Sequence, residues 1–116
     1  MTKNISRDEL VALLDAGENV QFVETLRAEH FAQGHLPGAV HIHFEEVEDR
    51  APAVLPDKDA LIVTYCSNTA CQNSRIAAEK LAKLGYTNVR RYEEGKQDWI
   101  EAGLEVDGAV TLDASA

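Results

Sequence analysis

Short apolar runs alternate along this chain with segments of helical periodicity, and that alternation limits the fold more than any other feature. The central pair is residues 61–65, a β-rich run typical of a strand buried on both faces, and residues 74–84, with apolar side chains at helical spacings. The other predicted strands are residues 20–23, 39–42 and 89–92, and the other predicted helices are residues 5–17, 24–31 and 96–102. The alternation predicts right-handed βαβ units, and so an α/β fold whose parallel sheet has helices on both faces.

Local signals mark the ends of some of these elements. Ser6 and Glu9 have the spacing of a capping box, which predicts the start of the first helix. Residues 44–47 are expected to form a single helical turn. Residues 51–59 are rich in Pro and Asp, and we expect a loop with some helix there.

Length and charge limit the domain organisation and the partners. We expect a single domain over residues 1–116, with its core at about residues 5–106 and a frayed tail over residues 107–116. The net charge of −9 argues against nucleic acid and anionic membranes as partners, because phosphates require clustered Lys and Arg. No apolar run approaches the roughly 20 residues of a membrane span. The N-terminus has no apolar signal core, so a cytoplasmic location is expected.

Cys66 follows the central strand directly, at the position where α/β proteins bind ligands. The helix that begins nearby offers unpaired N–H groups and positive potential, both of which favour a thiolate. Backbone N–H groups of a tightly curved loop could add an anion-binding nest. The predicted active-site loop comprises Ser67, Asn68, Thr69, Ala70, Cys71, Gln72, Asn73 and Ser74. From the residues alone, Cys66 is either a nucleophile or a buried thiol at the end of a strand.

Three blocks of the sequence resemble the rhodanese-like domain family in its single-domain form. They are residues 34–39 (Gly-His-Leu-Pro-Gly-Ala), residues 65–86 (Tyr-Cys, then Ser74, Ala-Ala and Gly-Tyr) and residues 94–104 (Glu-Gly, Trp and Ala-Gly-Leu). The resemblance implies a five-stranded parallel sheet and a structural role for His35. It also implies a sulfurtransferase in which Cys66 carries sulfane sulfur as a persulfide. No cofactor is expected. The implied partners are a small sulfur donor and a thiol acceptor, or a protein that accepts the sulfur.

The chain departs from the family pattern at the site itself. Leu26 stands where the first strand of the family usually ends in Arg, so one structural ion pair is lost or rebuilt. Asn73 stands where the active-site loop usually has Arg, and the loop is longer. Without that cation the dianion thiosulfate is disfavoured as donor. Arg75, in the first helical turn, and Lys96 are the candidate replacements for anion stabilisation.

A second thiol, Cys71, lies within the same loop. It is either a resolving thiol that attacks a Cys66 persulfide or sulfenate, or a small packing residue. A metal site is disfavoured, because two thiols fall short of the four ligands that structural zinc requires. Asn73 and Ser74 are expected to cap the following helix, and Ser74 to donate toward the sulfur of Cys66.

The sequence is compatible with three functions. The first is the persulfide sulfurtransferase. The second is a phosphatase or arsenate reductase, which the missing loop Arg disfavours because such loops hold an oxyanion with a guanidinium. The third is a non-catalytic or redox-sensing interaction module, for which the acidic surface and the paired cysteines Cys66 and Cys71 argue.

Overall fold

A five-stranded parallel sheet organises the domain in the computed structural model, which describes residues 3–108. The spatial order is β1-β5-β4-β2-β3, with every neighbouring pair parallel. The strands are β1 (Lys3–Asn4), β2 (Gln21–Glu24), β3 (Val40–His41), β4 (Ile62–Tyr65) and β5 (Val89–Tyr92). The α/β fold class and the five-stranded sheet are therefore confirmed. All four residues of β4 are buried, as expected for a strand at the centre of the sheet.

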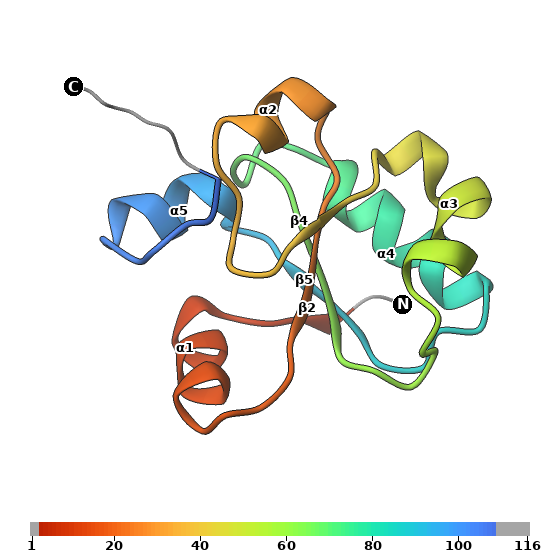
Figure 1. The fold of residues 1–116 in the computed structure, drawn as a ribbon, viewed down its shortest axis with the longest axis horizontal. Helices are drawn as coiled ribbons and strands as arrows, with labels where there is room; N and C mark the ends of the chain where they lie inside the picture. The colour runs from red at the N-terminus through yellow and green to blue at the C-terminus, as the bar shows by residue number, and fades with distance from the viewer. Residues whose placement is uncertain (1–2, 109–116) are drawn as a thin grey trace.

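Helices cover both faces of this sheet (Figure 1). They are α1 (Arg7–Asp15), α2 (Ala28–Ala32), the 3₁₀ turn η1 (Phe44–Glu46), α3 (Val47–Val54), α4 (Asn73–Lys83) and α5 (Gly95–Glu101). In the view of Figure 1, α1 and α5 lie to one side of the strands and α3 and α4 to the other. The capping box of α1 is confirmed, since the side chain of Ser6 accepts from the Glu9 N–H and the Glu9 carboxylate accepts from the Ser6 N–H.

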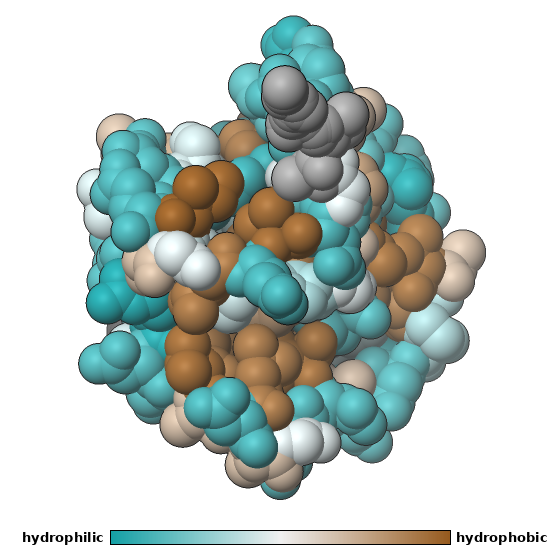
Figure 2. Space-filling view, turned by 60° about the vertical axis from the view of Figure 1, so that its left-hand side comes forward, coloured by the Kyte–Doolittle hydropathy of each residue, from teal (hydrophilic) through white to brown (hydrophobic). Residues whose placement is uncertain are grey.

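Each face of the sheet has its own hydrophobic core. Leu10 of α1 and Trp99 of α5 pack with Phe22 on one face, where the rings of Phe22 and Trp99 meet edge to face at 5.8 Å. Val47 of α3 and Leu81 of α4 pack in the second core, on the other face. Figure 2, which brings the side of α1 and α5 forward, shows hydrophobic side chains gathered there with hydrophilic side chains around and between them.

The helix α3 is longer than expected, because it joins the helical turn predicted at residues 44–47 to the segment predicted to be a loop with some helix. It ends at Val54, with Pro52 inside it. Val47, Ala51 and Leu55 recur every four residues and are all buried in the core beneath α4. Packing of this apolar face outweighs the unfavourable helix propensity of proline.

The domain also extends beyond the expected core of residues 5–106 at both ends. β1 adds a strand to the edge of the sheet, with Lys3 opposite Arg90. At the other end, Asp107 forms a bridge with His35, and its carboxylate accepts a hydrogen bond from the Gly38 N–H at 2.8 Å. Asp107 is thus part of the folded domain rather than of a frayed tail. The rest of that predicted tail, residues 109–116, lies outside the described residues.

His35 has the structural role that was expected of it. Its imidazole stacks on Phe31 with the ring centroids 3.8 Å apart, and its Nδ1 lies 3.0 Å from the Phe31 carbonyl. Together with the bridge to Asp107, these contacts join α2, the following turn and the C-terminal segment.

A buried polar network joins the ends of β2 and β4 to α5. The Glu24 carboxylate is fully buried and accepts from the Tyr65 hydroxyl at 2.8 Å and from Lys96 Nζ at 2.9 Å. Lys96 also donates to the carbonyls of His30 and Gly34, at 2.8 and 2.7 Å. Although Leu26 carries no charge, the end of β2 thus has a buried ion pair, between Glu24 and a lysine from α5.

Tyr65 makes the stability of the domain sensitive to alkaline pH. Burial, reinforced by the nearby Glu24 carboxylate, raises the pKa of its phenol well above the ordinary value of about 10. The folded state holds this proton more tightly than the unfolded state. The contribution to stability is therefore complete below about pH 10 and is lost as the pH rises above it.

We expect the free energy of unfolding to fall above about pH 10, and to fall less steeply for Tyr65→Phe. The slopes of the two proteins should differ by up to about 1.4 kcal/mol per pH unit. Urea titrations between pH 8 and 11 measure both slopes. Other tyrosines and lysines titrate in both proteins, so the difference isolates Tyr65. Equal slopes would contradict the prediction.

Candidate functional site

Cys66 lies immediately after β4, at the carboxyl edge of the sheet, and is 1% exposed. The start of the loop after it is held against α5. The Cys66 carbonyl accepts from the Lys96 N–H at 2.8 Å, and the Ser67 carbonyl from the Gln97 N–H at 2.9 Å. Gly95 permits this approach, because its φ is +75° and a Cβ there would lie 2.6 Å from the Cys66 carbonyl oxygen.

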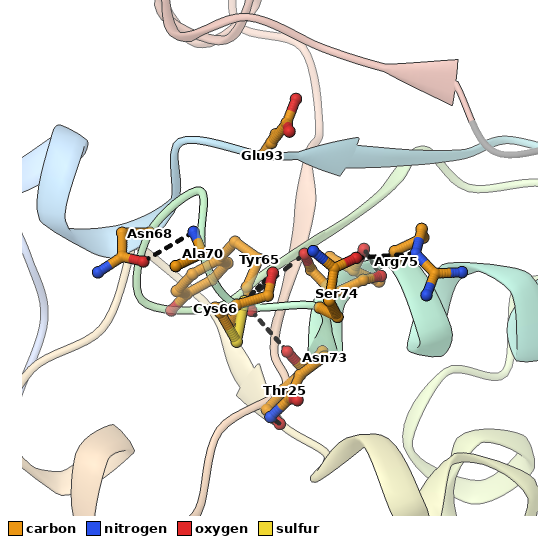
Figure 3. The surroundings of a disulfide bond; sticks show 12 residues. Thr25, Tyr65, Cys66, Asn68, Ala70, Asn73, Ser74, Arg75 and Glu93 are labelled. Carbon is orange, nitrogen blue, oxygen red and sulfur yellow. Dashed lines mark hydrogen bonds between the residues drawn. A yellow bond between two sulfur atoms is a disulfide. The ribbon is translucent and has the colours of Figure 1, made fainter.

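The loop then turns back over Cys66 (Figure 3). The Asn68 side chain accepts from the Ala70 N–H at 3.0 Å, and the Asn68 carbonyl accepts from the Cys71 N–H at 3.1 Å. This local turn is the kind that asparagine favours. Thr69 and Ala70 lie at the exposed tip, and Cys71 is brought back toward the end of the strand.

Cys66 and Cys71 are joined by a disulfide in this structure. Their Cα atoms are 6.4 Å apart, within the span that a disulfide allows. The two residues differ in exposure, since Cys66 is buried whereas Cys71 is partly exposed. The loop therefore places two cysteines within bonding reach, one a buried residue and the other a partly exposed residue.

Asn73 and Ser74 do not cap α4 as expected. The helix begins at Asn73, and its N-cap is Gln72, which makes no side-chain capping bond. Ser74 is the second residue of the helix and is fully buried, with its Oγ 3.7 Å from Cys66 Sγ. Asn73 instead donates from Nδ2 to the Thr25 carbonyl at 3.5 Å, which ties the loop to the end of β2 (Figure 3). The expected position of Ser74 beside the sulfur is found.

Neither predicted cation faces Cys66. Arg75 points along the outside of α4, where it donates to Gln72 and pairs with Glu79 at 3.2 Å (Figure 3). Its place in the helix directs it away from the sheet, so it does not replace the missing loop arginine. Lys96 is engaged by the buried Glu24 carboxylate and two carbonyls.

The cation at the site is Arg91 of β5, which the sequence analysis missed. Its side chain is 6% exposed. Nε donates to Ser74 Oγ at 2.9 Å, Nη2 donates to the Cys71 carbonyl at 3.2 Å, and Nη1 lies 3.8 Å from Glu93. Because Ser74 Oγ accepts from Arg91, its own proton is free to be directed at Cys66 Sγ. The register of β5 against β4, with Arg91 opposite Thr64, determines this placement, and no local signal in the sequence indicates it.

The predicted anion-binding nest is not formed in this disulfide state. Within residues 3–108, the groups within hydrogen-bond distance of Cys66 Sγ are Ser74 Oγ and the Cys71 carbonyl, and no loop N–H is among them. A nest around a free Cys66 thiolate stays a prediction for the reduced form.

A cavity of about 340 Å³ opens beside the loop, between α2 and α5. Its lining combines apolar and polar side chains: Leu26, His30, Gln33, Ser67, Lys96, Gln97, Ile100 and Glu101. Ile100 is 51% exposed at this place. The cavity shares Ser67 with the loop, so a small molecule bound there would lie next to the segment that carries Cys66.

Comparison with known proteins assigns the family. The sequence model of the rhodanese-like domain family matches residues 6–102, and the chain belongs to that family. Within residues 3–108, no helix has the length and apolar character needed to cross a membrane.

Curated relatives include regulatory and enzymatic proteins. The chain is 36% identical over 103 residues to the HTH-type transcriptional regulator Rv0324 of Mycobacterium tuberculosis, covering 89% of this chain and 44% of the relative. It is 38% identical over 61 residues to the thiosulfate sulfurtransferase PspE of Escherichia coli, covering 53% of this chain and 57% of PspE. The chain thus spans about half the length of the curated relatives it matches.

Solved structures share the fold. The BH2092 protein of Bacillus halodurans superposes with a TM-score of 0.84 at 27% identity, covering 94% of this chain and 79% of that one. The human single-domain sulfurtransferase TSTD1 superposes with a TM-score of 0.74 at 26% identity, covering 87% of this chain and 97% of TSTD1.

Proposed function

We propose that this domain is a sulfurtransferase that carries sulfane sulfur as a persulfide on Cys66 and passes it to a thiol or another nucleophile. The observation that carries the proposal is the position of Cys66, at the end of the central strand and beside the Arg91–Ser74 pair. A buried guanidinium and a hydroxyl favour the anionic form of a neighbouring sulfur. Two similar proteins add support, since PspE and TSTD1 are named as sulfurtransferases.

The reaction begins from the reduced protein. The Cys66 thiolate attacks the outer sulfur of a donor such as a persulfide, and the bond between that sulfur and the donor breaks. The donor leaves as a thiolate with the electron pair, and Cys66 retains the sulfur as a persulfide. An acceptor thiol then attacks the outer sulfur and regenerates the Cys66 thiolate. The cavity beside Ser67 is a suitable place for a small donor or acceptor.

The test is a mass measurement on reduced protein treated with thiosulfate, polysulfide or glutathione persulfide. In Cys71→Ser, where the second thiol cannot react, we expect a gain of about 32 Da, the mass of one sulfur atom, removable by dithiothreitol. A sulfinic acid has almost the same added mass but is not reversed by thiols. The double variant with Cys66→Ser should gain nothing. No Cys66-dependent gain with any donor would overturn the proposal.

The disulfide favours one alternative, a redox-sensing module in which Cys66 and Cys71 only interconvert between thiols and disulfide. The regulatory relative Rv0324 fits that interpretation. The same experiment separates the two functions. A protein that takes no sulfur from any donor but forms the disulfide readily with peroxide is a sensor.

A further inference from the structure

The two cysteines of the loop lie close enough to react with each other, and the two residues differ in exposure. We propose that Cys71 resolves the persulfide on Cys66, so that the domain releases hydrosulfide and is left as the disulfide seen in this structure. The activity would be a thiol-dependent reduction of sulfane sulfur. This inference rests on the proposed function, since it requires a persulfide on Cys66.

The step balances without an external oxidant. The Cys71 thiolate attacks Sγ of the Cys66 persulfide, and a bond forms between the two cysteine sulfurs. The bond from Cys66 Sγ to the outer sulfur breaks, and the outer sulfur leaves with the electron pair as hydrosulfide. The sulfane sulfur is reduced by two electrons, and the two cysteines are oxidised to the disulfide.

The backbone around Cys71 is held for attack on the inner sulfur. The Asn68 carbonyl accepts from the Cys71 N–H, and Arg91 Nη2 donates to the Cys71 carbonyl. These bonds fix Cys71 with its Cα 6.4 Å from that of Cys66, close enough for the two Sγ atoms to bond. Attack on the outer sulfur would need Cys71 to lie further away, and would move the sulfur to Cys71 without releasing it.

The exposure of the two cysteines also determines how the disulfide is reset. Cys66 is buried and the residue Cys71 is partly exposed, so we expect an external thiol to attack Cys71 and form a mixed disulfide there. Cys66 then leaves as the thiolate, beside Ser74 Oγ and Arg91. A second thiol releases Cys71. The co-substrate is therefore a small monothiol or a dithiol, and each turnover oxidises two thiol groups.

A single turnover without oxygen or added thiol tests the inference, and the glutathione that the donor releases is present equally in the wild-type and Cys71→Ser samples. Fully reduced, desalted wild-type protein receives one equivalent of glutathione persulfide, and released sulfide and intact mass are measured. We expect about one equivalent of sulfide and a protein two hydrogens lighter than the dithiol, which is the disulfide. Cys71→Ser should retain the added sulfur on Cys66 and release less than about a tenth as much sulfide until thiol is added. A sample without donor should stay reduced.

Two results would overturn the inference while leaving sulfur carriage intact. One is a wild-type protein that holds a stable persulfide on Cys66, releases no sulfide and keeps Cys71 open to alkylation. The other is added sulfur that maps to Cys71. If Cys71→Ser takes up no sulfur at all, the proposed function itself is overturned, and this inference with it.

Discussion

Replacing Lys96 with Met is expected to lower the free energy of unfolding by about 3–5 kcal/mol, the largest stability effect we predict for a single side chain. The substitution removes the cation that pairs with the fully buried Glu24 carboxylate. It also leaves the carbonyls of His30 and Gly34 without their donor. Breaking one side of a buried pair is costly because the remaining charge stays desolvated. Urea unfolding of the reduced proteins measures the change.

Arg75→Met is the matched control, because it removes an exposed cation from its pair with Glu79. Such surface pairs contribute little, and we expect a change within about 1 kcal/mol. The double variant Glu24→Leu with Lys96→Met should recover part of the loss, since no unpaired charge remains. A Lys96→Met protein as stable as Arg75→Met would show that the buried network does not support the domain as described.

Replacing Arg91 with Met is expected to slow persulfide formation on Cys66 by about ten- to a hundredfold. A hydrogen bond to a charged group contributes about 1.5–3 kcal/mol, which corresponds to that range of rates. Arg91 is a positioning residue, since it holds Ser74 Oγ 2.9 Å from its Nε and acts on the sulfur through that hydroxyl. Its charge also favours the thiolate. Rapid-mixing mass measurements in the Cys71→Ser background give the rate.

A purely structural role for Arg91 makes a different prediction. If Arg91 favours the thiolate, the pH profile of Cys66 alkylation by iodoacetamide should move to higher pH in Arg91→Met, and Arg91→Lys should restore part of the shift. Arg90→Met is the control, because Arg90 is the neighbouring residue of β5 and donates to the Val89 carbonyl. An unchanged alkylation profile in Arg91→Met would assign Arg91 to structure alone.

Two positions where the family usually has arginine carry no charge in this chain, and the cations near the site come from other elements. Asn73 occupies the loop position at which the resemblance implied an arginine, and the guanidinium near the sulfur comes from β5 instead. In the same way, Leu26 carries no charge, and the cation that pairs with the buried Glu24 is Lys96 of α5. Both cations come from segments that neighbour the loop in space but follow it in the chain.

The class of fold, the position of Cys66 and the start of α1 were determined by the sequence alone. Each depends on signals within a few residues: apolar spacing for the strands and helices, and the Ser6–Glu9 pair for the cap. Such signals persist in isolation, because the groups that interact are already neighbours along the chain. The same local reasoning indicated only part of α3, and the burial of Ala51 against the core stabilises this helix despite the proline next to it.

Tertiary structure alone decided which cation serves the site and what Cys71 faces. Arg91 and Ser74 are 17 residues apart, and Lys96 and Glu24 are 72 apart. Their contacts exist only once the parallel strands have adopted their register and α5 has docked against the loop. An arginine on a strand has the same sequence signal whether it faces solvent or a buried serine. The difference lies in which neighbours desolvate it, and distant segments supply those neighbours only in the folded domain.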